Sequence, residues 1–327
     1  MKPGARRIVK NSALALMWAV AFFLCALVLG AFPGIRSPEP EAETPAPARA
    51  AQGASGAVRV CVWNVKSYLD TYRFKDGVRT KGPKPESEKA EIIRVLSGIN
   101  PDVLGLSEIG GRPALLEFAE MLGEAGLDYP YKAVSDDSPE YPQCAILSKI
   151  PFERVERAGT GAFEYFGQKA RSPRGLLAAR FNTLGTEWVF GALHLKSRFG
   201  ARKRDPEFSK FRVLECREIA KFARRAAGDG AQAVIGGDFN DEPGDAAVLE
   251  LESAGLKVMP CAGEPTTYFW KKGGSGHRFD FFMATPEILE ASGPSRSPGI
   301  IRGASDHAPV YADLDFSKLR AKRQKAK

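Results

Sequence analysis

The sequence predicts an α/β fold with mixed β-sheets, and two patterns in the chain indicate this class. Short apolar runs typical of buried strands alternate with amphipathic segments typical of helices between residues 57 and 316. Two of the expected strands, over 175–182 and 187–195, flank Leu184-Gly185 and predict an antiparallel hairpin. A chain that combines hairpins with strand–helix alternation favours mixed sheets over a purely parallel sheet.

The first half of this body is predicted from apolar periodicity and from turn residues. The helix over 87–99 places Ile92, Ile93 and Leu96 on one side, and Asn100-Pro101 ends it. In chain order we expect a strand over 58–65, a loop over 66–85, a helix over 87–99, a strand over 103–107, a helix from Pro113 to Gly126, and a strand over 144–148.

The second half contains the longest expected helix of the body, over 205–228. Its apolar face carries Phe208, Phe211, Ile219, Phe222 and Ala226, and the opposite face carries Lys210, Arg217 and Arg224, which we expect to be solvated. A buried strand over 233–235, a helix over 243–254 and two strands over 279–283 and 309–314 follow. Cys61, Cys144, Cys216 and Cys261 match no zinc pattern, and sequence alone leaves both buried thiols and disulfides open.

The first 32 residues predict a signal anchor or a signal peptide. Lys2, Arg6, Arg7 and Lys10 precede an apolar run over 13–32 that is long enough to cross a bilayer as a helix. We favour an uncleaved single-pass anchor in a bacterial cytoplasmic membrane, with cleavage and secretion as the alternative. Because the basic residues precede the run, the body is expected outside the cytoplasm.

Residues 33–56 form a Pro- and Ala-rich linker, and residues 317–327 form a basic tail that we expect to fray. These ends carry the basic charge of the chain. Residues 1–49 have a net charge of +3 and residues 317–327 one of +6, which leaves −1 for residues 50–316 out of the total of +8. A global attraction of the body to nucleic acid is therefore not expected, although local basic loops are.

The stretch around Asp238 and Asn240 suggests metal and phosphate chemistry. The apolar run 233–235 and the pair Gly236-Gly237 precede it, and the i, i+2 spacing puts both polar side chains on one face of extended backbone. A carboxylate next to an amide suits a hard divalent cation. An Asx-rich turn after a strand explains the same residues without function.

Similar polar residues follow other apolar runs of the chain. Strand ends at one edge of a sheet are where sites form in α/β folds. Only three histidines are present, and two of them, His194 and His307, occupy such positions. The full set is Asn64, Glu108, His194, Asp238, Asn240, Asp280, Asp306 and His307.

Six motifs carried by these residues resemble the endonuclease/exonuclease/phosphatase superfamily and occur in its order. They are Trp63-Asn64, Leu106-Ser107-Glu108, Leu193-His194-Leu195-Lys196-Ser197, Gly237-Asp238-Phe239-Asn240, His277-Arg278-Phe279-Asp280 and Ser305-Asp306-His307-Ala308-Pro309. The resemblance covers residues 57–316. It implies a DNase I-like four-layered α/β sandwich, two packed mixed sheets flanked by helices, and hydrolysis of a phosphate ester with Mg²⁺, or Mn²⁺ or Ca²⁺ in its place.

The resemblance also implies roles for individual residues. Glu108 corresponds to the family's metal carboxylate, with Asn64 and Asp306 beside it, and Asp238 with Asn240 holds the attacking water, the phosphate or a second metal. His307, paired with Asp280, acts in proton transfer or as a further metal ligand. His194 protonates the leaving oxygen or binds phosphate, and whether His307 or Asp238 takes the proton of the water stays open.

Basic residues beside the motifs are candidates for binding substrate phosphate. They are Lys196, which is the best candidate, Arg174 and Arg198. The position two residues after Asn64 is Lys66, where several abasic-site endonucleases have an acid, and this disfavours a DNA-repair role.

Three functions fit the sequence. The first is a metal-dependent nuclease or phosphodiesterase acting on DNA or RNA outside the cytoplasm. The second is a phospholipase- or sphingomyelinase-like phosphodiesterase at a membrane surface, and the third is an inactive, tethered binding module. No protein partner is implied and a monomer is expected, whereas the substrate, endo or exo action and the number of metals are not determined by the sequence.

Overall fold

The structure is a computed structural model, and it describes residues 56–75, 78–137, 141–200, 203–263, 266–270 and 274–325. The predicted anchor over 1–32 and nearly all of the predicted linker over 33–56 lie outside the described residues. Within the part of the chain that is described, every helix is too short or too polar to span a bilayer.

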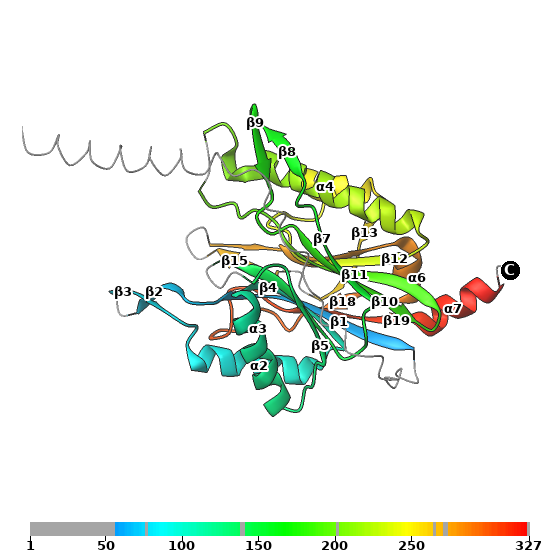
Figure 1. The fold of residues 1–327 in the computed structure, drawn as a ribbon, viewed down its shortest axis with the longest axis horizontal. Coiled ribbons are helices and arrows are strands. Elements are labelled where there is room, and N and C mark those ends of the chain that lie inside the picture. Colours follow the sequence, from blue (N-terminus) through cyan, green and yellow to red (C-terminus); the bar gives the residue numbers. More distant parts are fainter. Residues whose placement is uncertain are drawn as a thin grey trace, which may run out of the picture. The chain divides into compact units, whose positions relative to one another are not determined.

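A seven-stranded mixed sheet forms one half of the body (Figure 1). At its centre β1 pairs in parallel with β4 and antiparallel with β19. In spatial order its strands are β14 (Cys261–Ala262), β18 (Ser295–Arg296), β19 (Val310–Asp315), β1 (Ala57–Tyr68), β4 (Val103–Ile109), β6 (Gln143–Ser148) and β5 (Tyr131–Val134).

A six-stranded mixed sheet forms the other half. Its β10 and β11 make the predicted hairpin, and Leu184 and Gly185 take the positive φ values of 51° and 79° that a tight two-residue turn needs. In spatial order its strands are β13 (Lys257–Val258), β17 (Asp280–Ala284), β12 (Gln232–Asp238), β11 (Thr186–His194), β10 (Leu176–Thr183) and β7 (Arg154–Ala158).

The two sheets pack face to face around one apolar cluster. Val62 and Ile146 from the first sheet and Phe190, Val234 and Phe282 from the second are all buried in it. Glycine lets the sheets approach closely at this interface: a Cβ on Gly105 of the first sheet would come within 3.0 Å of the Phe190 ring of the second. Burial of each such side chain contributes about 1.5–3 kcal/mol.

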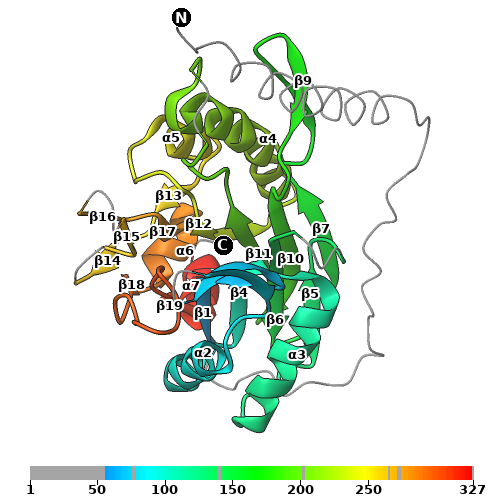
Figure 2. The same cartoon turned by 90° about the vertical axis from the view of Figure 1, so that its left-hand side faces the viewer.

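Helices cover the outer faces of both sheets, which makes four layers (Figure 2). Helices α2 (Glu86–Ile99) and α3 (Gly111–Glu124) pack against the first sheet through Leu96 and Phe118. Helices α4 (Ser209–Gly228) and α5 (Ala246–Glu252) pack against the second through Ile219 and Leu251. The predicted mixed α/β sandwich is therefore confirmed.

The structure differs from the sequence predictions at three places. Residues 66–85, predicted as a loop, extend β1 and then form the hairpin β2 (Thr71–Lys75) and β3 (Val78–Gly82). The basic tail, predicted to fray, forms α7 (Phe316–Lys325), because Phe316 and Leu319 are buried against the core. The helix predicted from Asp205 begins at Ser209, after the short 3₁₀ turn η1 (Pro206–Phe208) in which Glu207 and Phe208 have positive φ.

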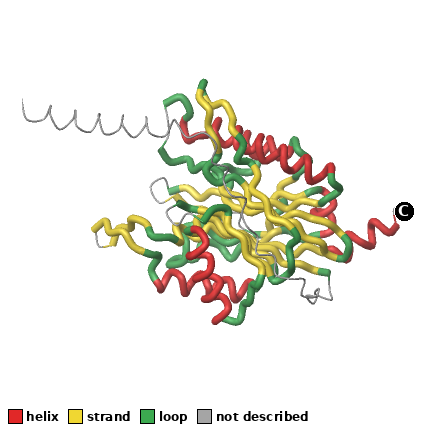
Figure 3. Tube along the Cα trace, viewed as in Figure 1, coloured by secondary structure: helices red, strands yellow, loops and turns green. Residues whose placement is uncertain are grey.

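Short elements that apolar periodicity did not reveal complete the body (Figure 3). They are the hairpins β8 (Ala162–Tyr165) with β9 (Gln168–Arg171) and β15 (Tyr268–Trp270) with β16 (Ser275–His277), and the helix α6 (Pro286–Ala291). The four cysteines of the body are free thiols, three of them buried, so no disulfide joins these described residues.

We expect Gly237→Ala to lower the free energy of unfolding by roughly 3 kcal/mol. Gly237 has a φ of 140°, and a Cβ there would lie 2.1 Å from the carbonyl oxygen of Leu193 on the neighbouring strand. Denaturant unfolding measures the change. The control is Gly98→Ala in α2, where an added Cβ would meet no neighbouring atom within 4 Å. This substitution should stabilise the protein by about 0.5–1 kcal/mol. Equal stability of both variants would contradict the steric argument.

Candidate active site

The predicted polar residues meet at one edge of the sandwich because of how the strands are paired. Asn64 lies beside Ser107 in the parallel pair β1–β4, next to Glu108. His194 lies beside Asp238 in the parallel pair β11–β12, and Asp280 lies on the other side of Asp238 in β17. The carboxyl ends of the parallel strands in both sheets therefore contribute to a single site.

Asn64 joins the two halves of this site. Its Nδ2 donates to Oε1 of Glu108 at 3.2 Å and to Oδ2 of Asp238 at 3.0 Å. Its Oδ1 accepts from the backbone N–H of Lys66 at 3.0 Å, which sets the orientation of the amide. Asn64 and Asp238 are both buried, so each hydrogen bond satisfies a polar atom that would otherwise lack a partner.

The Glu108 carboxylate is held by an irregular bend near the end of β1, where the strand register shifts between Asn64 and Tyr68. The N–H and Oγ of Ser67 donate to Oε2 of Glu108 at 2.7 and 3.1 Å. Lys66, Ser67 and Glu108 all have positive φ, of 49°, 51° and 66°. Such strain in non-glycine residues is common at functional sites. Ser67 was not predicted from the sequence, since no pattern shows that this serine faces the carboxylate.

His307 and Asp280 form the predicted pair. Nδ1 of His307 lies 2.8 Å from Oδ2 of Asp280, so the other ring nitrogen, Nε2, faces Asp238 at 3.8 Å from its Oδ2. Tyr268 covers the His307 ring at a centroid distance of 4.6 Å. Thr267, which was also not predicted, accepts from the backbone N–H of Asp280 at 2.9 Å and fixes the strand end.

Charge is distributed unequally over the two histidines. Burial lowers the pKa of His307, but the carboxylates of Asp280 and Asp238 outweigh this and raise it to about 10, so the ring is cationic at neutral pH. Burial lowers the pKa of His194 well below its usual range, and the nearby Arg174 and His307 lower it further. The 3.4 Å contact of His194 Nε2 with Oδ2 of Asp238 is thus made by a neutral ring.

Asp238 is a carboxylate with a raised proton affinity. Its Oδ1 accepts the N–H of Asn240 at 2.9 Å. Burial raises the pKa of Asp238 to about 6, partly offset by the attraction of His307. A carboxylate with a pKa near neutrality can accept a proton and release it again at physiological pH.

Two groups of side chains at this edge have the donors that a divalent cation needs. Asp238, Asp280 and His307 could supply ligand atoms that lie within 4.8 Å of one another. A cationic His307 bonded to Asp280 is a poor ligand, because its proton competes with a metal. Glu108 makes no ion pair among the described residues, so its carboxylate, which accepts from the Asn64 amide and from Ser67, fits Mg²⁺ better as an oxygen ligand.

Asp306, Asn240 and the predicted phosphate-binding cations also lie around this edge. Asp306 pairs with Lys66 at 3.4 Å, and Nδ2 of Asn240 donates to the Leu195 carbonyl at 3.2 Å. Arg174 donates to the same Leu195 carbonyl at 2.7 Å. Each of these groups has a partner within the protein.

Lys196 and Arg198 have different kinds of partner. The Lys196 ammonium donates to the carbonyls of Ser197 and Phe199 at 3.1 and 3.4 Å and lies 4.0 Å from the centre of the Phe208 ring. Arg198 donates to the Asn240 carbonyl at 2.8 Å and pairs with Asp241, Asp245 and Glu207. Arg198 therefore holds the Asn240 loop in this structure, and phosphate binding by these cations stays a prediction.

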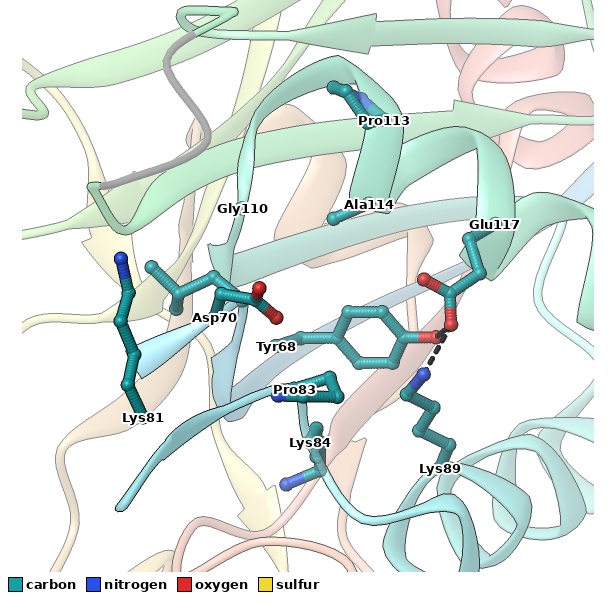
Figure 4. Close-up of a pocket in the computed structure, with 11 residues that line it drawn as sticks. Tyr68, Asp70, Lys81, Pro83, Lys84, Lys89, Gly110, Pro113, Ala114 and Glu117 are labelled. Atoms are coloured by element: carbon teal, nitrogen blue, oxygen red, sulfur yellow. Dashed lines mark hydrogen bonds and ion pairs between the residues drawn. The ribbon is translucent and has the colours of Figure 1, made fainter. Parts of the chain in front are cut away.

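A pocket of about 380 Å³ is lined by the end of β1, by β3 and by residues of α2 and α3 (Figure 4). Tyr68, Leu69, Gly110, Pro113 and Ala114 contribute to its walls. Two of its lysines are neutralised by glutamates, since Lys84 pairs with Glu88 at 2.9 Å and Lys89 with Glu117. The remaining lining residues are Asp70, Lys81 and Pro83.

The fold and the site define a phosphoester hydrolase, and comparison with known proteins agrees. Residues 61–307 match the sequence profile of the Endonuclease/Exonuclease/phosphatase family, and the chain belongs to this family. A search of curated proteins finds no match.

Several solved structures share the fold at low identity. The chain is similar to a family protein from Leptotrichia buccalis (16% identity, 79% of this chain and 100% of that chain, TM-score 0.57) and to the human Nocturnin catalytic domain with a bound sulfate anion (17%, 79% and 94%, 0.55). It is also similar to a 3′–5′ exonuclease from Neisseria meningitidis (20%, 79% and 99%, 0.55). A 3′ phosphatase from Neisseria, bound to product DNA hairpin, gives similar values (20%, 79% and 99%, 0.54).

We expect the free energy of unfolding, measured with chelator present, to fall between pH 7 and pH 10 by at most about 1.4 kcal/mol per pH unit on account of His307. Native His307, with its pKa raised to about 10, keeps a proton that the unfolded chain loses above about pH 6.5. Stability from this source is thus complete below pH 6.5 and lost as the pH rises through 10.

His307→Gln should remove this part of the pH dependence, and His277→Gln serves as the control for loss of a histidine. Urea unfolding at several pH values gives the measurement. Parallel profiles for the wild type and His307→Gln would contradict a cationic His307.

Proposed function

We propose that this protein is a divalent-metal-dependent phosphodiesterase that cleaves DNA or RNA outside the cytoplasm. The observation that carries the proposal is the placement of Asp238 between Asn64, His194 and cationic His307 at one edge of the sandwich. A buried acceptor of protons next to a fixed positive charge is what hydrolysis of a phosphodiester requires. Membership of the Endonuclease/Exonuclease/phosphatase family supports the same chemistry.

In this proposal Glu108, Asn64 and Asp306 hold Mg²⁺, with Mn²⁺ or Ca²⁺ as alternatives. When bound, the ion neutralises charge on the phosphoryl oxygens and stabilises the leaving oxygen. Asn64 would contribute through its Oδ1, which in this structure accepts from the Lys66 N–H while Nδ2 faces Glu108. Ser67 keeps the Glu108 carboxylate in a single orientation.

Asp238 takes the proton of the attacking water in this proposal. Its pKa of about 6 leaves it mostly ionised at neutral pH, yet basic enough to accept a proton. His307 supplies positive charge to the phosphoryl oxygens, because its pKa of about 10 makes it a poor base. Asp280 orients the ring through Nδ1. His194 and Asn240 position the phosphate beside Asp238.

In this proposal the substrate is a nucleic acid. Two of the structural neighbours are named as a 3′–5′ exonuclease and as a 3′ phosphatase bound to a DNA hairpin. Assays with plasmid DNA, RNA, a chromogenic bis-phosphodiester and sphingomyelin separate the candidates. Turnover of sphingomyelin alone would replace nucleic acid with a lipid substrate, and turnover of none would overturn the proposal.

We further propose that residues 1–32 anchor the protein in the membrane with its body outside the cytoplasm, or are cleaved on secretion. The basic residues before the apolar run support this orientation. A reporter fused after Lys327 should be active only if it is of a type that works outside the cytoplasm, and activity of a cytoplasmic reporter would contradict the proposal.

Replacement of Glu108 by Gln should raise the concentration of Mg²⁺ needed for half-maximal activity by roughly 10-fold or more, because a carboxylate ligand loses its charge. Rates measured against Mg²⁺ concentration test this, and the matched control is Glu120→Gln on the exposed face of α3. An unchanged requirement for Mg²⁺ in Glu108→Gln would remove Glu108 from the metal site.

His307→Ala and Asp280→Asn should each lower kcat by about 10²–10⁴-fold, and the double variant should be little worse than His307→Ala. The reason is that Asp280 acts through the ring it holds. His194→Ala should combine with His307→Ala more nearly multiplicatively.

Values of kcat for these variants at saturating Mg²⁺ show how the losses combine, and their melting temperatures confirm that they are folded. Losses that multiply for Asp280 and His307, together with a lowered melting temperature of Asp280→Asn, would show that Asp280 has only a structural role.

A further inference from the structure

The hairpin β2–β3 presents an aromatic ring and two cations on one face. Tyr72 pairs directly with Lys81, and the alternation of strand faces puts Arg79 on the same side. Figure 1 shows this hairpin projecting from the end of β1, away from the first sheet. Tyr72 is 58% exposed, and the Arg79 guanidinium lies 4.3 Å from the centre of its ring.

Neither Arg79 nor Lys81 forms an ion pair with any residue that the structure describes. Exposed cations of this chain differ in this respect: Arg217 and Lys221 on α4 pair with Glu250 and Glu218. The hairpin face therefore adds local positive charge to a body whose net charge is close to zero.

The opposite face of the hairpin is tied to the active site. Arg73 donates to the carbonyls of Ser67, Leu69 and Pro83, at 3.0 Å for the last two. Ser67 in turn holds the Glu108 carboxylate. The hairpin is thus anchored to the same bend that orients the proposed metal ligand.

The pocket adjoins this face of the hairpin and is also lined by Tyr68, next in the chain to Ser67, and by Gly110, two residues after Glu108. Lys81 lines the pocket and is also the cross-strand neighbour of Tyr72, so the pocket and the ring are adjacent. Leu69, Pro83 and Pro113 give it apolar walls, and Asp70 and Lys81 give it polar groups. A volume of about 380 Å³ suits one nucleoside.

We propose that the pocket and the hairpin face bind unpaired nucleotides of a nucleic acid on one side of the scissile phosphate. The nucleoside next to that phosphate occupies the pocket, the following base stacks on Tyr72, and Arg79 and Lys81 contact backbone phosphates. An exposed aromatic ring with adjacent cations is typical of single-strand binding, since every base can stack on it. This proposal rests on the proposed function and names its substrate as single-stranded.

Binding of a fluorescein-labelled deoxythymidine decamer to the full-length protein, followed by anisotropy with chelator present, tests the proposal without any hydrolysis. Tyr72→Ala should raise Kd by roughly 5- to 100-fold, the range for loss of one base–aromatic stack, and Tyr72→Trp should keep the affinity. Arg79→Ala with Lys81→Ala should reduce the slope of log Kd against log salt by about 1.4. Ala114→Trp, which fills the pocket, should also weaken binding.

The control for Ala114→Trp is Glu120→Trp, which lies on the same helix but outside the pocket lining. The control for Arg79→Ala with Lys81→Ala is Arg217→Ala with Lys221→Ala, which removes the same charge from α4. Neither should change Kd by more than about twofold. Wild-type affinity of the Tyr72 and Arg79/Lys81 variants, or no binding of the decamer by the wild type, would overturn the proposal. Absence of hydrolysis in the substrate assays would instead overturn the proposed function and leave this binding result standing.

Discussion

The active site depends on the burial of Asp238 between the two sheets. A carboxylate removed from water is costly unless hydrogen bonds and opposite charge compensate it. Here Asn64 from the first sheet, the Asn240 backbone and cationic His307 supply that compensation. The two sheets must therefore pack in one register, because the hydrogen bond from Asn64 to Asp238 crosses the interface between them.

The same burial explains how two histidines of one site come to differ in charge. His307 has Asp280 as a direct hydrogen-bond partner and stays protonated. His194 has no such bond to Asp280 in the described structure, and burial of its ring keeps it neutral. A fixed cation and a neutral ring on either side of one carboxylate give the site its polarity. Division of labour between chemically identical residues is set by their surroundings.

Much of the candidate site could be predicted from the sequence, because its residues follow apolar runs and strand ends are recognisable. Asn64, Glu108, His194, Asp238, Asp280 and His307 do meet at one edge. The supporting residues could not be predicted. Ser67 and Thr267 act through hydrogen bonds to residues 41 and 13 positions away, and a lone Ser or Thr carries no signal for such a contact. The hairpin β2–β3 was missed because charged residues and glycines mask its short strands.

The sequence by itself determined the mixed α/β class, the order of the main strands and helices, and the family, since periodicity and motif order are properties of the chain. Only the tertiary structure decided the charge states of His194, His307 and Asp238, because burial and distances between charges set them. It also decided that Arg198 holds the Asn240 loop and that Tyr72, Arg79 and Lys81 share the face of the hairpin opposite Arg73. These facts depend on which atoms lie next to each other, and that is set by packing and strand register rather than by residue type.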